Sequence, residues 1–287
     1  MKEDCRIAVV SMASITGRID LNVNKIINIT KRTVKNGAKL VVFPEMALQG
    51  YSNSDMDVLA LTLIDPVIKQ LARIASELQV TLLVGFAERS EDNQKPYISQ
   101  LVAFPDGKVS TYRKVHLGRL EKQWFTAGTE FPVFSSQGIK FAVGICWDWH
   151  FPEMAAIYSL KGAEVLFAPH ASLKISGNRN KMWKQYMGTR AYDNSVYLAA
   201  CNMSGVDSRG REFSSGAMVW GPKGEILAES LNENEKVLYA DLSAFKLNEL
   251  RTVERKSMKD SFFLAYRRKE MYTELLELEV GSSQEAQ

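Results

Sequence analysis

Three side chains in this sequence have the types that nucleophilic catalysis needs, and the first is a cysteine at the end of a strand. Cys146 follows the apolar run 141–145 and precedes a helix start at Pro152. A thiol placed there, close to backbone N–H groups and a cation, loses its proton more easily and becomes a nucleophile. The alternative is a packed core cysteine, because free cysteines are among the most buried residues.

A cysteine nucleophile needs a base, and no known spacing ties any histidine of the chain to Cys146. Glu45 follows four apolar residues and a proline, which predicts a carboxylate at the mouth of a sheet. Partial burial would raise its pKa toward neutral pH, as a general base requires. Lys114 ends a predicted hairpin and can hold an oxyanion, although a solvated lysine at a strand end is its alternative.

These residues must be positioned by strands and helices that alternate along the chain. Short apolar runs alternate with segments of 3.6-residue period, a pattern typical of an α/β fold. The sequence predicts strands over residues 6–11, 40–44, 81–88, 99–104, 109–113, 140–146, 164–168, 196–202, 216–220 and 226–229. It predicts helices over residues 19–35, 66–78, 152–161 and 181–193.

Two segments share one pattern, which indicates an internal repeat. Residues 37–45 and 162–170 each run from a glycine helix cap through a buried strand to a proline and a polar residue. Glu45 and His170 are therefore expected at equivalent strand ends, where open α/β sheets bind their ligands. A histidine that is hydrogen-bonded for structural reasons is the alternative for His170.

The turns that join strands repeat as well, and they extend the same pattern. Residues 104–108 and 220–224 are both turn sequences between two predicted strands. The chain is thus expected to fold as two similar half-units in one body. We expect a single domain over residues 1–280, with residues 281–287 as a frayed polar tail.

Composition limits the classes of protein that the chain can belong to. Its 287 residues carry a formal net charge of +3 and show no basic run typical of a nucleic-acid surface. No apolar run approaches the length of a membrane span, and no signal peptide is recognisable, so the expected compartment is the cytoplasm. The three cysteines and three histidines lack disulfide or metal-ligand spacing, so we expect no metal and no cofactor.

The segments around the three candidates resemble the motifs of the nitrilase (carbon-nitrogen hydrolase) superfamily. They read FPEMALQGY over 43–51, YRKVHL over 112–117 and GICWD over 144–148, in family order and at family spacing. The resemblance implies Glu45 as general base, Lys114 as oxyanion stabiliser and Cys146 as nucleophile. It also implies a four-layer α-β-β-α sandwich that dimerises, so a homodimer or higher homo-oligomer is expected.

The resemblance adds further site residues. Family members carry a second glutamate after the lysine motif, and Glu121 stands there, with a surface acid as its alternative reading. The backbone N–H of Trp147 would share the oxyanion with Lys114. Tyr51, Trp149, His150 and His170 are candidates for the substrate pocket, although core packing is the alternative for the aromatic residues.

The branch of the superfamily is indicated by the residues after the cysteine. Residues 146–153 are similar to the N-carbamoylputrescine amidohydrolase pattern, and Asp148 stands where nitrilases usually carry glutamate. Carbamoylases of D-amino acids carry an arginine in this loop to bind a carboxylate, and here Trp149 and His150 replace it. Residues 178–183, with the cations Arg179, Lys181 and Lys184, could bind an anionic tail, although a solvated loop and helix face is the default reading.

The sequence therefore predicts an amidohydrolase for a small amide or N-carbamoyl substrate, which releases ammonia through a cysteine thioester. A nitrile hydrolase is the near alternative. A binding protein or an enzyme that passes the acyl group to an amine is the alternative of a different class. Besides further copies of the chain, the expected partners are water and the small molecule, with neither nucleic acid nor membrane.

Overall fold

The computed structural model describes residues 1–52, 56–90, 95–231, 235–252 and 257–277, whose strands form two six-stranded sheets. The first sheet has the order β12-β1-β2-β3-β4-β5. Its strands are β1 (Cys5–Ser11), β2 (Leu40–Val42), β3 (Thr81–Glu88), β4 (Tyr97–Ala103), β5 (Val109–Arg113) and β12 (Lys236–Leu242).

The second sheet has the order β11-β10-β9-β8-β7-β6. Its strands are β6 (Phe134–Ser136), β7 (Ile139–Val143), β8 (Val165–His170), β9 (Tyr197–Asn202), β10 (Ala217–Trp220) and β11 (Ile226–Ser230). The α-helices are α1 (Ile19–Lys35), α2 (Met56–Leu59), α3 (Pro66–Glu77), α4 (Pro152–Leu160), α5 (Arg179–Asn194) and α6 (Ala244–Thr252). Short 3₁₀ helices are η1 (Glu121–Gln123), η2 (Cys146–His150), η3 (Lys174–Ser176), η4 (Met258–Asp260), η5 (Phe263–Tyr266) and η6 (Lys269–Leu276).

The two sheets repeat one strand order, as the sequence pattern predicted. Strands β1, β2 and β3 are parallel and are followed by antiparallel β4 and β5, and β7 to β11 are paired in the same way. Each sheet has one further antiparallel strand at the corresponding place, β12 beside β1 and β6 beside β7. The sequence patterns did not predict these two strands.

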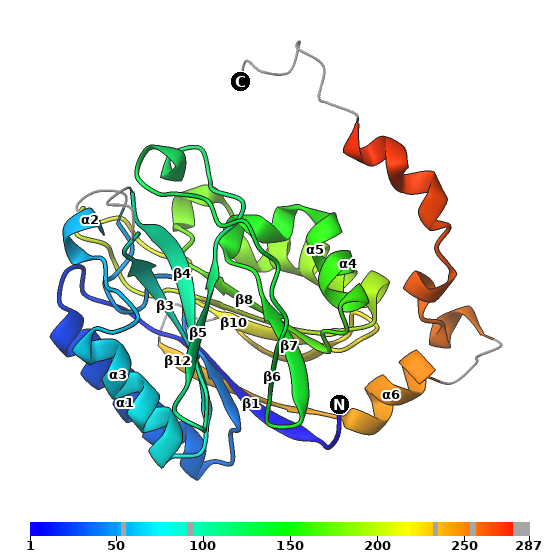
Figure 1. Ribbon diagram of the computed structural model, residues 1–287, viewed down its shortest axis with the longest axis horizontal. Helices are drawn as coiled ribbons and strands as arrows, with labels where there is room; N and C mark the ends of the chain where they lie inside the picture. Colours follow the sequence, from blue (N-terminus) through cyan, green and yellow to red (C-terminus); the bar gives the residue numbers. More distant parts are fainter. Residues whose placement is uncertain (53–55, 91–94, 232–234, 253–256, 278–287) are drawn as a thin grey trace.

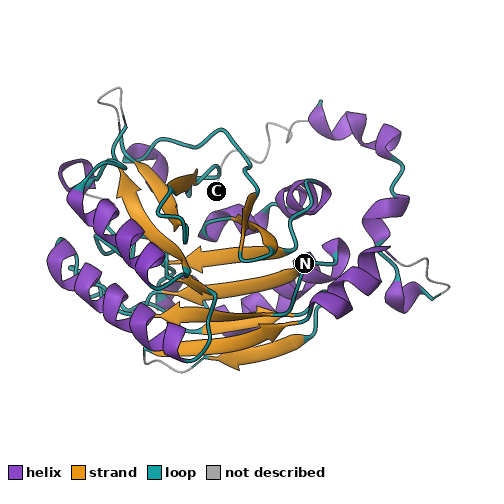
Figure 2. Ribbon diagram, turned by 60° about the horizontal axis from the view of Figure 1, so that its bottom comes forward, coloured by secondary structure: helices purple, strands orange, loops and turns teal. Residues whose placement is uncertain are grey.

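Helices cover the outer face of each sheet, and the inner faces pack together (Figures 1 and 2). Strand β1 shows the alternation that this requires. Ile7 and Val9 belong to the core between the sheets, whereas Ala8 and Val10 belong to the core beneath α1 and α3. With α4 and α5 on the second sheet, the four layers are α-β-β-α, which confirms the predicted fold class.

Local signals account for where the helices begin. Pro66 and Pro152 start α3 and α4, as predicted, because proline lacks the N–H that a first turn leaves unpaired. Helix α5 begins at Arg179, two residues earlier than predicted, because the Asn178 side chain accepts a hydrogen bond from the backbone N–H of Lys181 at 3.0 Å. Helices α2 and α6 were not predicted.

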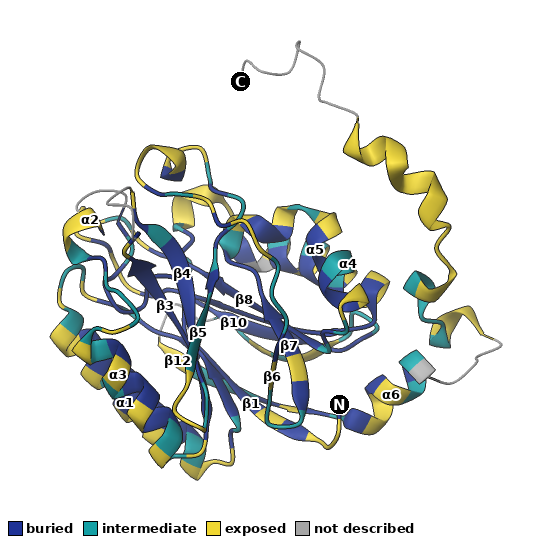
Figure 3. Ribbon diagram, in the orientation of Figure 1, coloured by how far each residue is buried: buried dark blue, intermediate teal, exposed yellow. Residues whose placement is uncertain are grey.

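The described chain ends in a segment, 257–277, whose η5 packs against α5 through Phe263 and Tyr192 and whose last part extends away from the body of the molecule (Figure 1). Its side chains are mostly exposed, Tyr266 and Leu276 among them (Figure 3). The predicted tail, residues 281–287, lies outside the described residues. Within the part of the chain that is described, no helix combines the length and the apolar character needed to cross a membrane.

Candidate active site

Glu45 lies in a tight loop that follows β2 and is pressed against β3. A Cβ on Gly85 of β3 would stand 2.2 Å from the carbonyl oxygen of Pro44 and 2.4 Å from the nitrogen of Met46, so only glycine allows this approach. The side chain of Gln49 also accepts a hydrogen bond from the backbone of β3 at 3.0 Å. The carboxylate of Glu45 is consequently buried, with 1% exposure.

Lys114 directly follows β5 and is buried to the same degree as Glu45. Its backbone N–H donates to the carbonyl of Ile98, and its carbonyl accepts from the N–H of Gly128, both at 2.8 Å. Its Nζ donates to Oε1 of Glu45 and to Oε1 of Glu121, each at 2.8 Å. The alternative of a solvated lysine at a strand end is therefore wrong.

Glu121 is held in place by neighbours from two separate loops. Its Oε1 accepts a hydrogen bond from the Tyr51 hydroxyl at 2.9 Å, in addition to that from Lys114. Its Oε2 accepts from the backbone N–H of Gly118 at 2.7 Å. The surface reading of Glu121 is wrong, and Tyr51 contacts the same cluster of charges.

Cys146 begins η2 with a φ of +47°, a backbone conformation in which a side chain is strained. It is half-buried, and its Sγ lies 3.5 Å from Oγ of Ser172. The neighbouring Ala171 donates its N–H to Oε2 of Glu45 at 2.9 Å. The two residues that follow β8 therefore contact the thiol of Cys146 and the carboxylate of Glu45. Cys5 and Cys201, by contrast, are packed within strands, as predicted.

The buried carboxylate of Asp148 anchors the cysteine loop. Its Oδ2 accepts from the N–H of Ile145 at 2.8 Å and from the Tyr112 hydroxyl at 2.7 Å. Its Oδ1 accepts from the backbone N–H of His116 at 2.8 Å and from Nδ1 of that histidine at 3.0 Å. Tyr112 and His116 were not predicted as site residues, although both lie in the lysine motif, residues 112–117.

The buried charges shift one another's pKa. Desolvation, aided by the charge of Glu121, raises the pKa of Glu45 to about 7, although Lys114 opposes this. Desolvation disfavours the charged ammonium, but the two carboxylates outweigh it and hold the pKa of Lys114 well above its usual value. Desolvation also acts on Glu121, yet Lys114 and the hydrogen bonds to this carboxylate keep its pKa low. Glu45 is thus the carboxyl group that exchanges protons near neutral pH.

The thiol is held in its protonated form, which corrects the expectation that it loses its proton more easily. Desolvation, followed by the charge of Glu45, raises the pKa of Cys146 to about 12, while Lys114 acts in the opposite direction. A thiol of this pKa attacks only when a neighbouring base removes its proton. Glu45 is a buried base of suitable pKa, and it acts electrostatically on the thiol.

The predicted pocket residues take different places. Trp149 is fully buried in the core, where its indole N–H donates to the carbonyl of Gly144, so its assignment to the pocket is corrected. Trp147 and His150 lie at the exposed rim of the cysteine loop, with ring centroids 4.9 Å apart. His170 is fully buried, and desolvation holds its pKa well below the usual value. Its Nδ1–H donates to the carbonyl of Ala168 at 2.8 Å, because a carbonyl oxygen can only accept.

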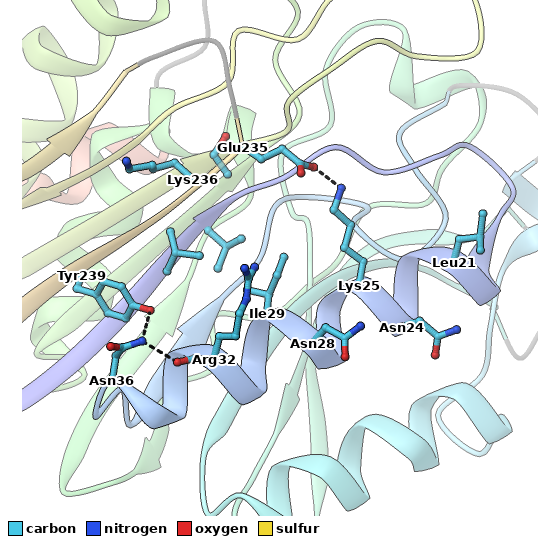
Figure 4. Close-up of a pocket in the computed structure, with 13 residues that line it drawn as sticks. Leu21, Asn24, Lys25, Asn28, Ile29, Arg32, Asn36, Glu235, Lys236 and Tyr239 are labelled. Carbon is cyan, nitrogen blue, oxygen red and sulfur yellow. Dashed lines mark hydrogen bonds and ion pairs between the residues drawn. The ribbon is translucent and has the colours of Figure 1, made fainter.

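A hollow elsewhere on the surface has none of these residues in its lining. This cavity of about 740 Å³ lies between α1 and β12, where Lys25 forms an ion pair with Glu235 (Figure 4). Its lining mixes polar and apolar side chains, and none of the candidate catalytic residues contributes to it. The chemistry therefore belongs to the buried cluster between the ends of β2, β5, β7 and β8.

Comparisons with known proteins agree with this arrangement. Residues 6–252 match the model of the carbon-nitrogen hydrolase family. A nitrilase from Pyrococcus abyssi is 30% identical over 254 residues, which are 85% of this chain and 94% of that protein. An omega-amidase from Xenopus tropicalis is 30% identical over 246 residues, covering 80% of this chain and 86% of that protein.

Solved structures of an amidase from Nesterenkonia share the fold. One is 26% identical, with a TM-score of 0.81, and covers 96% of this chain and 97% of that chain. Another, a glutamate-to-glutamine mutant, is 25% identical with a TM-score of 0.80 and covers 94% of this chain and 96% of that chain. It shows the acetamide moiety of fluoroacetamide added covalently at the active site cysteine. From the family match, the fold and the buried cluster around a half-buried thiol, we conclude that this chain belongs to the carbon-nitrogen hydrolase family.

Proposed function

We propose that this protein is an amidase that hydrolyses a small linear amide or N-carbamoyl amine and releases ammonia. The observation that carries the proposal is the buried Lys114, which bridges Glu45 and Glu121 at 2.8 Å each beside the thiol of Cys146. An ion triad of this kind is costly to bury, so a catalytic role explains it better than a stabilising one.

In the first half of the reaction, Cys146 attacks the carbonyl carbon while Glu45 takes the thiol proton. The negative charge that develops on the carbonyl oxygen is stabilised by Nζ of Lys114 and by the backbone N–H of Trp147 in the first turn of η2. Glu45 then gives its proton to the leaving nitrogen. Ammonia departs, and the acyl group remains on Cys146 as a thioester.

In the second half, water replaces ammonia. Glu45 takes a proton from the water as its oxygen attacks the thioester carbon, and the same two donors stabilise the second oxyanion. The carbon–sulfur bond breaks, and Glu45 returns the proton to the sulfur. Glu121 acts by positioning Lys114 and by raising the pKa of Glu45, since its charge is one cause of that shift.

Ammonia release from a panel of neutral amides, N-carbamoyl amines and nitriles tests the proposal. We expect turnover of amides or carbamoyl amines by the wild-type chain and none by Cys146→Ala. Cys201→Ala is the matched control, because that thiol lies within β9 and should leave turnover intact. Turnover that survives in Cys146→Ala would exclude the proposed nucleophile.

A nitrile hydrolase is the second candidate, and the nitrilase among the relatives favours it. Nitriles in the panel decide between the two, because a nitrile hydrolase releases ammonia from them faster than from the matching amides. A folded chain that is silent on every compound would instead point to binding or acyl transfer. Mass spectrometry then shows whether Cys146 becomes acylated and whether added hydroxylamine removes the acyl group. Acylation that hydroxylamine removes indicates acyl transfer, and an unmodified Cys146 indicates binding.

A further inference from the structure

One face of α5 carries four polar side chains with unpaired buried atoms. Arg179, Trp183, Tyr186 and Arg190 recur at three- and four-residue spacing, which places them on one side of the helix. Among the described residues, the atoms Nε of Arg179, Nε1 of Trp183, the hydroxyl of Tyr186 and Nε of Arg190 are buried and have no hydrogen-bond partner. Native proteins pair nearly all buried polar groups, so a concentration of this kind indicates a binding surface.

This face borders the catalytic cluster. The ring of Tyr186 stacks on that of His150, with centroids 4.9 Å apart and planes inclined by 28°. The indole of Trp183 contacts His170 at the end of β8 with centroids 5.0 Å apart, and Nε2 of this histidine is likewise buried and unpaired. The α5 face is thus joined to the cysteine loop on one side and to β8 on the other.

Arg179 stands out on this face because its charge is buried without a counterion. The residue is 8% exposed, and no carboxylate in the described part of the chain forms an ion pair with it. Its charge acts on the cysteine loop, since it opposes the desolvation that raises the pKa of Cys146 and adds to the desolvation that lowers the pKa of His150. Lys114 differs in this respect, because two carboxylates neutralise it.

A desolvated guanidinium without a counterion is a strong binder of planar anions. Its fork of N–H donors matches the two oxygens of a carboxylate, and burial strengthens each of these charge-assisted bonds. The cysteine loop, residues 146–151, contains no lysine or arginine, and burial lowers the pKa of its His150. Helix α5 can therefore supply from another element the cation that the loop lacks.

We propose that Arg179, assisted by the hydroxyl of Tyr186, binds the carboxylate of a substrate whose amide group is attacked by Cys146. The substrate is then a small molecule with one amide and one carboxylate. Two sources of that chemistry are a monoamide of a dicarboxylic acid and an N-carbamoyl amino acid. This inference rests on the proposed function and adds a substrate class to it.

The kinetic test compares acids with their methyl esters, which keep the amide and lose the negative charge. Glutaramic acid and N-carbamoylglycine represent the two sources, each measured beside its ester. We expect Arg179→Gln to lower kcat/KM for one of the acids by about 100-fold, chiefly through KM, because it removes a charge-assisted bidentate contact. The ester should change by less than about threefold, and Arg179→Lys should recover part of the loss.

Lys181→Gln is the matched control, since this exposed lysine lies on the same turn of α5. It should leave both the acid and the ester unchanged. Equal losses for acid and ester in Arg179→Gln would mean that Arg179 only positions or activates Cys146, and the proposal would be overturned. Unchanged turnover of both acids in Arg179→Gln would overturn it equally.

A binding measurement separates this proposal from the proposed function. Calorimetry of glutaramic acid and N-carbamoylglycine with Cys146→Ala should detect binding that disappears in Cys146→Ala combined with Arg179→Gln. If the wild-type chain releases no ammonia but this difference in binding is present, the proposed function fails and the carboxylate site stands. Binding that is indifferent to Arg179 would exclude the carboxylate site whatever the turnover.

Discussion

The two halves of this molecule share one strand order but contribute different chemistry. In the first half, β2 leads to Glu45 and β5 leads to Lys114. At the corresponding places in the second half, β8 ends at His170, which is buried and neutral, and β11 is a largely exposed strand that ends at Ser230. The repeat therefore reproduces the scaffold and not the charges.

The nucleophile shows the reverse asymmetry. Cys146 follows β7, whereas the corresponding strand, β1, ends at Ser11, whose hydroxyl donates to the carbonyl of Asn202. The first half thus supplies the base and the cation, and the second half supplies the thiol. The hydrogen bond from Ala171 to Glu45 joins the two halves at the site, so the site is complete only when both sheets pack together.

The largest expected effect contrasts Glu45 with His170, which occupy equivalent strand ends. Glu45→Gln should lower kcat by about 10³-fold or more, because it removes the general base of both half-reactions. His170→Asn should keep a donor for the carbonyl of Ala168 and lose less than about tenfold. Steady-state ammonia release measures both, and comparable losses in the two variants would contradict the asymmetry.

Lys114→Met should abolish turnover and also destabilise the fold in a pH-dependent way. It leaves Glu45 and Glu121 buried without their cation, at a cost of about 3 kcal/mol. Both carboxyl pKa values in the folded variant then rise above those of the unfolded chain, so stability is lost as pH increases through the folded values. Urea unfolding should therefore show a larger deficit at pH 8 than at pH 5.

The control for that measurement is Lys108→Met. Lys108 lies in the turn between β4 and β5 and forms an exposed ion pair with Asp106. Its loss should cost less than about 0.5 kcal/mol, with little dependence on pH. A deficit of the same small size in both variants would mean that Lys114 does not neutralise buried carboxylates.

A smaller effect is expected from the anchor of the cysteine loop. Asp148→Asn replaces one carboxylate oxygen by an amide that cannot accept its two hydrogen bonds, so Cys146 should move from its position. We expect kcat to fall by about 30-fold, since small misplacements of a reacting group are costly. Asp241→Asn, at an exposed aspartate of β12, should leave kcat unchanged. Unaltered kcat in Asp148→Asn would show that the loop holds its shape without this anchor.

The smallest effect concerns pH. We expect kcat/KM to rise with pH through about 7, because Glu45 must lose its proton before it can act as a base and its pKa is about 7. Glu121→Gln removes a negative charge that raises this pKa, so the rising limb should move to lower pH while turnover is reduced. If the pH at which kcat/KM rises is the same in Glu121→Gln as in the wild type, the group that titrates is not Glu45.

The sequence predicted most of the scaffold because its signals are local. Short segments contain the signals that the structure confirms. One is the proline in the first turn of α3 and of α4, and the other is the pattern shared by residues 37–45 and 162–170. Strands β6 and β12 were missed because each is an added edge strand stabilised by its neighbour. Strand β6 has only three residues, whereas residues 236–242 alternate between the two cores, a strand pattern that was not recognised.

The site was predicted less completely, because burial depends on contacts between distant segments. Motif spacing drew attention to Glu45, Lys114 and Cys146, but could not show that Lys114 lies between two carboxylates. Trp149 was assigned to the pocket because an aromatic side chain in a loop can point to the pocket or to the core. In the structure it packs against Gly144 and points into the core. That Nε of Arg179 has no hydrogen-bond partner among the described residues is likewise visible only once α5 is placed against the cysteine loop.

The pairing of β1 with β12 has a consequence for synthesis of the chain on the ribosome. All seven residues of β1 pair with β12, from Cys5 with Leu242 to Ser11 with Lys236. Because chains emerge from their N-terminus, the first sheet exposes one edge of β1 until residues 236–242 have been translated. The half that carries the base and the cation is therefore begun first and finished last. Nascent chains that stall before that point would carry an open sheet edge, where a chaperone or another chain could attach.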